Sequence, residues 1–211
     1  MNKQKLIWGV IAIFIIGMLW WGASKQGAGN STPTTVPDPS VLPGIQTSEA
    51  PWLVEVDHLA ARLAADSLKP QTMEGQVLHI HQHLDLIVHG KPVEVPTNIG
   101  IHQRAGWLST VHSHDTTGII HVESPFKATF TLGQVFDIWG VRFTSECLGG
   151  YCTDESESAT STLQVYVNGE LFTGDPRILA LGERQEIAII FGTATETPAI
   201  IPSTYTFPEG Y

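Results

Sequence analysis

Polar and apolar side chains alternate along residues 77–88, which contain three of the nine histidines of the chain. Every second residue from His79 to Asp85 is polar, and the residues between them are apolar except for Gln82. This period of two predicts a long strand, followed by a turn at residues 89–92 and a short strand at residues 93–95. Further strands are expected at residues 108–114, 118–124, 128–132, 163–167, 170–173 and 186–191.

A helical spacing precedes these strands. Trp52, Val56, Leu59 and Leu63 follow one another at intervals of four, three and four residues, which predicts a helix within residues 50–66. A second, short helix is expected at residues 134–140. The fold class predicted is therefore α+β, a mostly antiparallel β-sheet domain with one or two packed helices. The second half of the domain is compatible with a β-grasp-like arrangement.

An uncharged run of 18 residues extends from Leu6 to Ala23, with Lys3 and Lys5 before it. As a helix it would be about 27 Å long, close to the roughly 30 Å of a bilayer core. The lysines favour a cytoplasmic N-terminus, so we expect a single-pass membrane protein whose C-terminal domain is extracytoplasmic, in the periplasm or at the cell surface. A cleaved signal peptide is the alternative.

This segment sets the expected organisation of the chain. Residues 1–23 are a cytoplasmic tip and membrane anchor, and residues 24–49 are a flexible linker rich in Pro, Ser, Thr and Gly. Residues 50–192 form the extracytoplasmic domain, and residues 193–211 form a weakly ordered C-terminal extension.

The charge balance narrows the choice of partners. The formal net charge is −10, and the first 26 residues hold three lysines and no acid, so the remainder carries −13. An acidic domain argues against a nucleic-acid partner, which would require a basic surface. The nine histidines, by contrast, nearly equal the eleven lysines and arginines in number.

The two cysteines, Cys147 and Cys152, are separated by four residues that include two glycines. Outside the cytoplasm such a pair is most simply a disulfide. A thiolate metal site is the alternative.

Five histidines are expected to converge. A turn at residues 115–118 would pair two antiparallel strands so that His121 lies opposite His112, with His114 on the same face. His81 and His83 share one face of the earlier strand. The predicted metal ligands are His81, His83, His112, His114 and His121. His79 is a possible outer member.

The residue types limit the metal. Imidazole-rich sites suit zinc or copper, and a blue-copper or Met-rich copper(I) site lacks the required Cys and Met neighbours. Copper or zinc is therefore the expected ion, with its identity open. Glu123 and Asp115 could orient imidazoles, and Glu123 could also be a ligand or general base. A cupin motif begins similarly near His81, but its Glu is missing.

Three functions are compatible with these residues. The first is a membrane-tethered, extracytoplasmic protein that binds copper or zinc. The second is a metal-dependent hydrolase, lyase or oxidase with a three-His site, in which Glu123 or Asp115 would move protons. The third is a structural or partner-binding envelope domain that uses the sheet and Trp139, with the protein partner unknown.

Slightly more than half of the chain resembles a known group of sequences. The matching segments are HIHQHLD from His79, VPTNIGI from Val95, HSHDTTGIIHVESP from His112 and LGQVFDIWG from Leu132. They resemble an uncharacterised family of membrane-anchored, extracytoplasmic, His-rich bacterial and archaeal proteins. The resemblance implies family membership and export, and it implies no activity.

Overall fold

The computed structural model describes residues 36–153 and 160–211. The expected membrane segment from Leu6 to Ala23 lies outside these residues and stays a prediction, as do residues 24–35 of the predicted linker. Residues 36–49, expected to belong to the linker, pack on the domain: Leu42 is buried, and the backbone N–H of Gln46 donates a hydrogen bond to the carbonyl oxygen of Gly140. Within the described ranges, no helix is long and apolar enough to cross a membrane.

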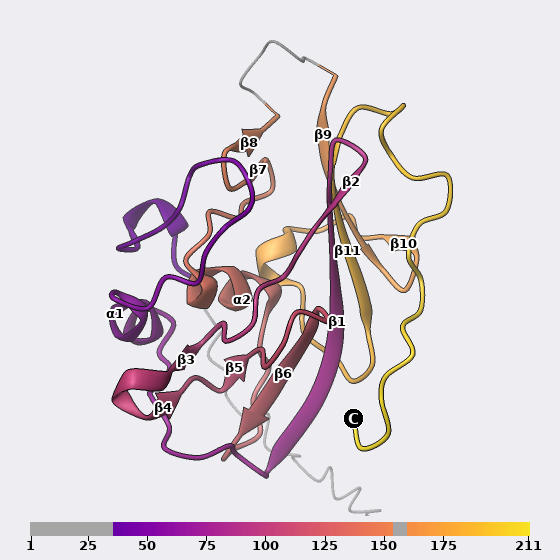
Figure 1. The fold of residues 1–211 in the computed structure, drawn as a ribbon. Helices are drawn as coiled ribbons and strands as arrows, with labels where there is room; N and C mark the ends of the chain where they lie inside the picture. The colour runs from indigo at the N-terminus through magenta and orange to yellow at the C-terminus, as the bar shows by residue number, and fades with distance from the viewer. Residues whose placement is uncertain (1–35, 154–159) are drawn as a thin grey trace, which may run out of the picture. The chain divides into compact units, whose positions relative to one another are not determined.

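A seven-stranded sheet forms the centre of the domain (Figure 1). The strand order is β10-β9-β11-β1-β6-β5. β6 pairs with the first half of β1, and β2 pairs with the end of β1. The bounds are β1 (Leu78–Val88), β2 (Lys91–Val93), β5 (Val111–His112), β6 (Ile119–Ser124), β9 (Thr162–Val167), β10 (Glu170–Leu171) and β11 (Glu186–Gly192). Within this sheet, only β1 and β11 pair in parallel. The prediction of a mostly antiparallel α+β domain is confirmed, and the β-grasp-like arrangement of its second half stays a prediction.

Two helices, α1 (Leu59–Ala65) and α2 (Leu132–Trp139), lie on one side of the sheet (Figure 1). The apolar residues of β1, such as Leu84 and Leu86, belong to the same buried core as α2. A capping box between Thr131 and Gln134 begins α2, and Gly140, at φ 84°, ends it. Trp139 is fully buried, so the predicted role of this residue in a partner interface is wrong.

The predicted elements differ from the observed ones in several places. The strand expected at residues 108–114 is divided into Trp107–Leu108, which pairs outside the main sheet, and β5. The short strand expected at residues 93–95 is β2, two residues earlier. The helix expected within residues 50–66 begins only at Leu59, and Trp52 is buried against Trp139 from an irregular segment before it. The strand expected at residues 128–132 is absent from the described fold. There Thr131 makes one isolated bridge to Ala180 and caps α2 instead.

Small elements complete the domain. They are β3 (Ile101–His102), β4 (Trp107–Leu108), β7 (Cys147–Leu148), β8 (Tyr151–Cys152) and the 3-10 helices η1 (Pro39–Val41), η2 (Gln103–Ala105) and η3 (Pro176–Ile178). The hairpin of β7 and β8 is closed by a disulfide between Cys147 and Cys152, with an S–S distance of 2.08 Å. The predicted disulfide is confirmed, and it removes both thiols from metal binding.

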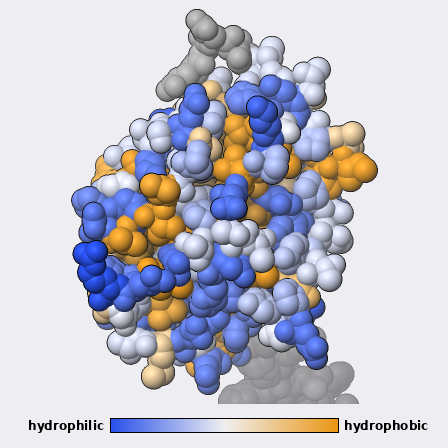
Figure 2. Space-filling view, viewed as in Figure 1, coloured by the Kyte–Doolittle hydropathy of each residue, from blue (hydrophilic) through white to orange (hydrophobic). Residues whose placement is uncertain are grey.

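Residues 193–211 contain no helix or strand, yet their side chains pack on the sheet. They run along the side opposite the helices (Figure 1). This cover, together with the helices, explains why every residue of β11 is buried and why its sequence is almost continuously apolar. On the face seen in Figure 2, apolar side chains form separate patches between hydrophilic ones.

The buried carboxyl group of Asp66, at the C-terminal end of α1, should make the stability of the domain depend on pH. Burial, with the nearby charge of Asp137, raises the pKa of Asp66 from 3.8 to about 8, and neither oxygen of Asp66 has a hydrogen-bond partner. Because the pKa is higher in the folded state, folding takes up a proton, and this group costs stability as the pH rises from about 4 to about 8.

The Asp66→Asn variant is therefore expected to gain stability relative to the wild type as the pH rises from 5 to 8, by an amount on the order of 3–4 kcal/mol. Urea unfolding at both pH values measures this difference. Asp57→Asn, at an exposed position before α1, is the control and should follow the wild type. If the free energies of unfolding of Asp66→Asn and the wild type change by the same amount between pH 5 and pH 8, Asp66 does not titrate in this range.

Candidate metal centre

Three adjacent strands carry the histidines of the candidate site. In the ladder, His81 of β1 pairs with His121 of β6, and His121 pairs with His112 of β5. His79 pairs with Glu123 in the next row. Because alternate residues of a strand share a face, all five side chains lie on the face opposite the helices. The predicted register of His112 and His121 is confirmed.

His114 joins this row from beyond the end of β5. Its Nε2 lies 3.1 Å from Nε2 of His112, and its ring centre lies 4.5 Å from that of His121. The loop that follows is held by Asp115, whose Oδ1 accepts a hydrogen bond from the backbone N–H of Thr117 at 2.8 Å. Asp115 therefore has the structural role of a turn cap.

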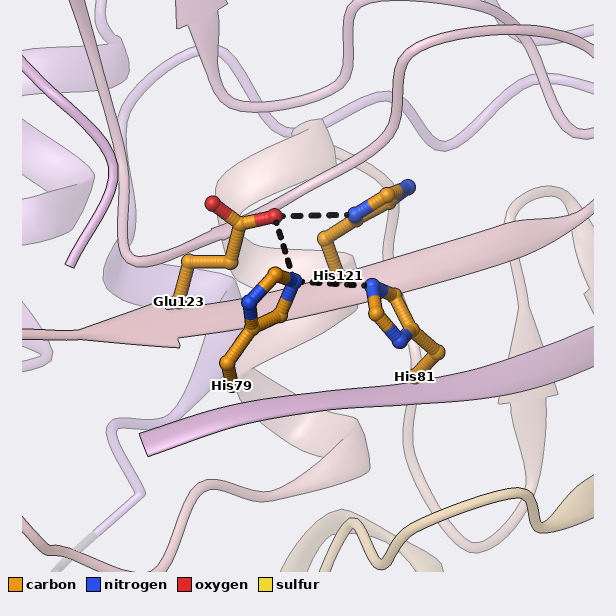
Figure 3. Close-up of side chains that lie close together, drawn as sticks. All are labelled: His79, His81, His121 and Glu123. Carbon is orange, nitrogen blue, oxygen red and sulfur yellow. Dashed lines mark hydrogen bonds and ion pairs between the residues drawn. The ribbon is translucent and has the colours of Figure 1, made fainter. Parts of the chain in front are cut away.

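The donor atoms fall into two overlapping groups, in each of which all atoms lie within 4.8 Å of one another. The first contains His79, His81, His121 and Glu123 (Figure 3). The second contains His112, His114, His121 and Glu123. We call these six residues the histidine cluster.

The spacing within the first group is that of ligands around one ion. Nε2 of His79 lies 3.1 Å from Nε2 of His81 and 3.3 Å from Oε1 of Glu123, and Oε1 lies 3.1 Å from Nδ1 of His121. Two ligand atoms at about 2.0–2.1 Å from a tetrahedral ion are separated by about 3.3–3.4 Å. Small side-chain adjustments would therefore suffice to close the first group around an ion.

The cluster has a buried base and an exposed rim. The side chain of His112 is fully buried, and those of His121 and Glu123 are almost so. In contrast, the side chains of His79 and His114 are 50% and 39% exposed. An ion could reach the buried donors past these two rim histidines.

His81 and His112 are neutral at physiological pH. Burial, with the neighbouring His121 and His79 imidazoles, lowers the pKa of His81 to about 4. Burial also lowers the pKa of His112 to about 4. Nδ1 of His112 lies 3.0 Å from the carbonyl oxygen of Ser109, which can only accept, so Nδ1 carries the proton and Nε2 presents its lone pair to the cluster.

Glu123 is ionised in this setting. Burial opposes its charge, but the hydrogen bond from His121 and the nearby histidines outweigh burial and lower the pKa of Glu123. The cluster thus combines the neutral imidazoles of His81 and His112 with one negative charge.

His83 is the one predicted ligand that the structure places outside the cluster. Its Nδ1 lies 2.8 Å from Oε2 of Glu186, and its Nε2 lies 2.8 Å from the carbonyl oxygen of Thr117. Although burial opposes the charge, the hydrogen bond and charge of Glu186 raise the pKa of His83. His83, Asp85 and Glu186 form a third group of closely spaced possible ligands. Because both ring nitrogens of His83 donate hydrogen bonds, however, His83 offers no lone pair to an ion.

The sequence did not assign His79 and Glu123 of the histidine cluster firmly as metal ligands. His79 could be assigned only as an outer candidate and Glu123 only as one of several roles, because both depend on the pairing of β1 with β6. The remaining histidines lie elsewhere. They are His58, which bonds Glu55, His89, which bonds Glu196, and His102, which caps η2.

Two tyrosines of the C-terminal segment cover this face. The Tyr211 ring lies 4.8 Å from the ring centre of His81 and 5.4 Å from that of His121. The Tyr205 ring stacks on His83 at 3.8 Å. Arg184 donates a hydrogen bond to the carbonyl oxygen of Tyr211, which fixes this segment beside β1.

Sequence and structure comparisons add no functional assignment to this geometry. Protein-family models, curated proteins and solved structures gave no match to the chain, so the family resemblance of the four motifs stays a prediction.

Proposed function

We propose that this protein binds a transition-metal ion, zinc or copper(II), through the histidine cluster. The observation that carries the proposal is the convergence of five imidazoles and one carboxylate on a single face of the sheet, with the closest donor atoms 3.1–3.3 Å apart. Burying so many polar groups is costly unless they are satisfied, and a bound ion would satisfy them.

The donor types support this choice of ion. Imidazole and carboxylate ligands suit zinc and copper(II), whereas copper(I) favours thiolates and thioethers. Both cysteines of the chain are joined in the disulfide, so neither can supply a thiolate.

We further propose that the site lies outside the cytoplasm, tethered to a membrane by the segment from Leu6 to Ala23. The disulfide supports export, since such bonds persist mainly in oxidising compartments. The lysines before the apolar run support the same orientation. Holding an ion there would serve sensing, delivery or buffering.

Metal retention tests the proposal. The full chain, purified in detergent with an N-terminal tag that lacks histidine, is stripped with chelator, loaded with zinc or copper(II) and desalted. We expect at least one ion per chain by elemental mass spectrometry. The His112→Ala/His121→Ala variant should retain less metal than the wild type, because it removes one donor from the first group and two from the second.

The matched control is His89→Ala/His102→Ala, which also removes two histidines but leaves the cluster intact. It should retain metal as the wild type does. Thermal unfolding of each variant shows that the fold is kept. Loss of metal from the wild type on desalting, or retention of as much metal by His112→Ala/His121→Ala as by the wild type, would overturn the proposal.

A further inference from the structure

The histidine cluster divides into two halves about the central strand β6. His79 and His81 come from β1 on one side, and His112 and His114 come from the β5 end on the other. His121 and Glu123 on β6 lie between them and belong to both groups. Oε1 of Glu123 lies 3.3 Å from Nε2 of His79 and 4.0 Å from Nε2 of His112, so it faces both halves.

The six donors are too widely spread for one ion. Six ligands at about 2.1 Å from a single octahedral ion would all lie within about 4.3 Å of one another. Among the described residues, no group with all donor atoms within 4.8 Å combines a histidine of the β1 pair with one of the β5 pair. Each half, completed by the shared residues, does meet this limit with four donors.

We propose that the cluster holds two metal ions side by side, an inference that rests on the proposed function. The His79/His81 pair binds one ion, and the His112/His114 pair binds the other. The Glu123 carboxylate, whose Oε1 faces both pairs, bridges the two ions, and His121 supplies a nitrogen to one of them. In protein sites of this kind the two ions lie about 3.5–4 Å apart, a distance that one carboxylate can span.

Nearby carboxylates offset the repulsion between two cations. Oε1 of Glu74 lies 3.5 Å from Nε2 of His114, beside the second half. Oε2 of Glu183 accepts a hydrogen bond from the backbone N–H of His81 at 3.1 Å, beside the first half. Each half therefore has a carboxylate of its own in addition to the shared Glu123.

Copper(II) titration of the full chain in detergent distinguishes one ion from two. Copper(II) is the probe because it binds nitrogen sites most strongly among the divalent first-row metals and gives an electron paramagnetic resonance signal. We expect two tightly held ions per wild-type chain, with a signal weaker than two isolated ions would give, because the neighbouring spins couple. His79→Ala/His81→Ala and His112→Ala/His114→Ala should each hold one ion with the full signal of an isolated centre.

The outcomes separate this inference from the proposed function. One ion per wild-type chain, or loss of all metal from both pair variants, overturns the two-ion arrangement and leaves metal binding intact. No retained ion overturns both. His79→Ala and His114→Ala, which change only the exposed rim, repeat the test with less risk to folding and should each weaken one of two binding steps.

Discussion

Zinc or copper(II) at a hundred times its Kd is expected to raise the melting temperature of the metal-free protein by about 5–11 °C. An ion that binds only the folded state at this concentration adds about 2.7 kcal/mol to the free energy of unfolding, and a domain of this size gains about 2–4 °C per kcal/mol. The gain is large here because the donors come from three strands and have no common position in an unfolded chain.

His121→Ala should lose most of this increase. His121 lies between the two pairs, and even residues that only support a metal ligand typically cost ten- to a hundredfold in affinity when replaced. A hundredfold weaker Kd at the same metal concentration reduces the gain to about 0.4 kcal/mol. Differential scanning calorimetry measures both proteins, and His89→Ala should behave as the wild type does. An equal shift in His121→Ala would locate the bound ion elsewhere.

Arg177→Met is expected to lower the free energy of unfolding by about 3–5 kcal/mol, because it leaves a buried carboxylate without its counter-charge. Arg177 donates a hydrogen bond to Oδ2 of Asp137 at 2.6 Å, and both side chains are buried. The same guanidinium donates to the carbonyl oxygens of Phe143 and Pro37, so it also joins α2 to the segments beside it.

The pH dependence and a double variant separate charge from packing in this result. Burial raises the pKa of Asp137 to about 6 even though Arg177 is present to oppose it. Without Arg177 the carboxyl is easier to protonate, so the loss should be greater at pH 8 than at pH 5. Arg177→Met/Asp137→Asn should recover part of the stability at pH 8. A loss that is the same at both pH values would assign the effect to the lost backbone hydrogen bonds.

The sequence predicts the site best where pairing is local. His112 and His121 are joined by a short turn, and a turn fixes the register of its two strands, so their opposition follows from spacing alone. His79 and Glu123 become neighbours only when β1 pairs with β6, and no turn connects these strands directly.

His83 shows where sequence reasoning fails. It has the same strand parity as His81, and nothing in its neighbourhood distinguishes the two. Its partner Glu186 lies 103 residues away on β11, in the one parallel pairing of the sheet. Parallel pairing carries no turn signature, so the carboxylate that stabilises the protonated form of His83 could not be identified in advance.

The position of β11 has a consequence for the order in which the sheet forms. The strands with the six donors end at Ser124, whereas β11, which joins β1 to β9, begins only at Glu186. Contacts between distant segments form slowly, so β1, β6 and β5 can pair while one edge of β1 is still bare. An uncovered edge invites pairing with other chains, and an ion held across the three strands would cross-link them during that interval. The long separation between β1 and β11 thus makes the folding chain, rather than the finished domain, the form most exposed to aggregation.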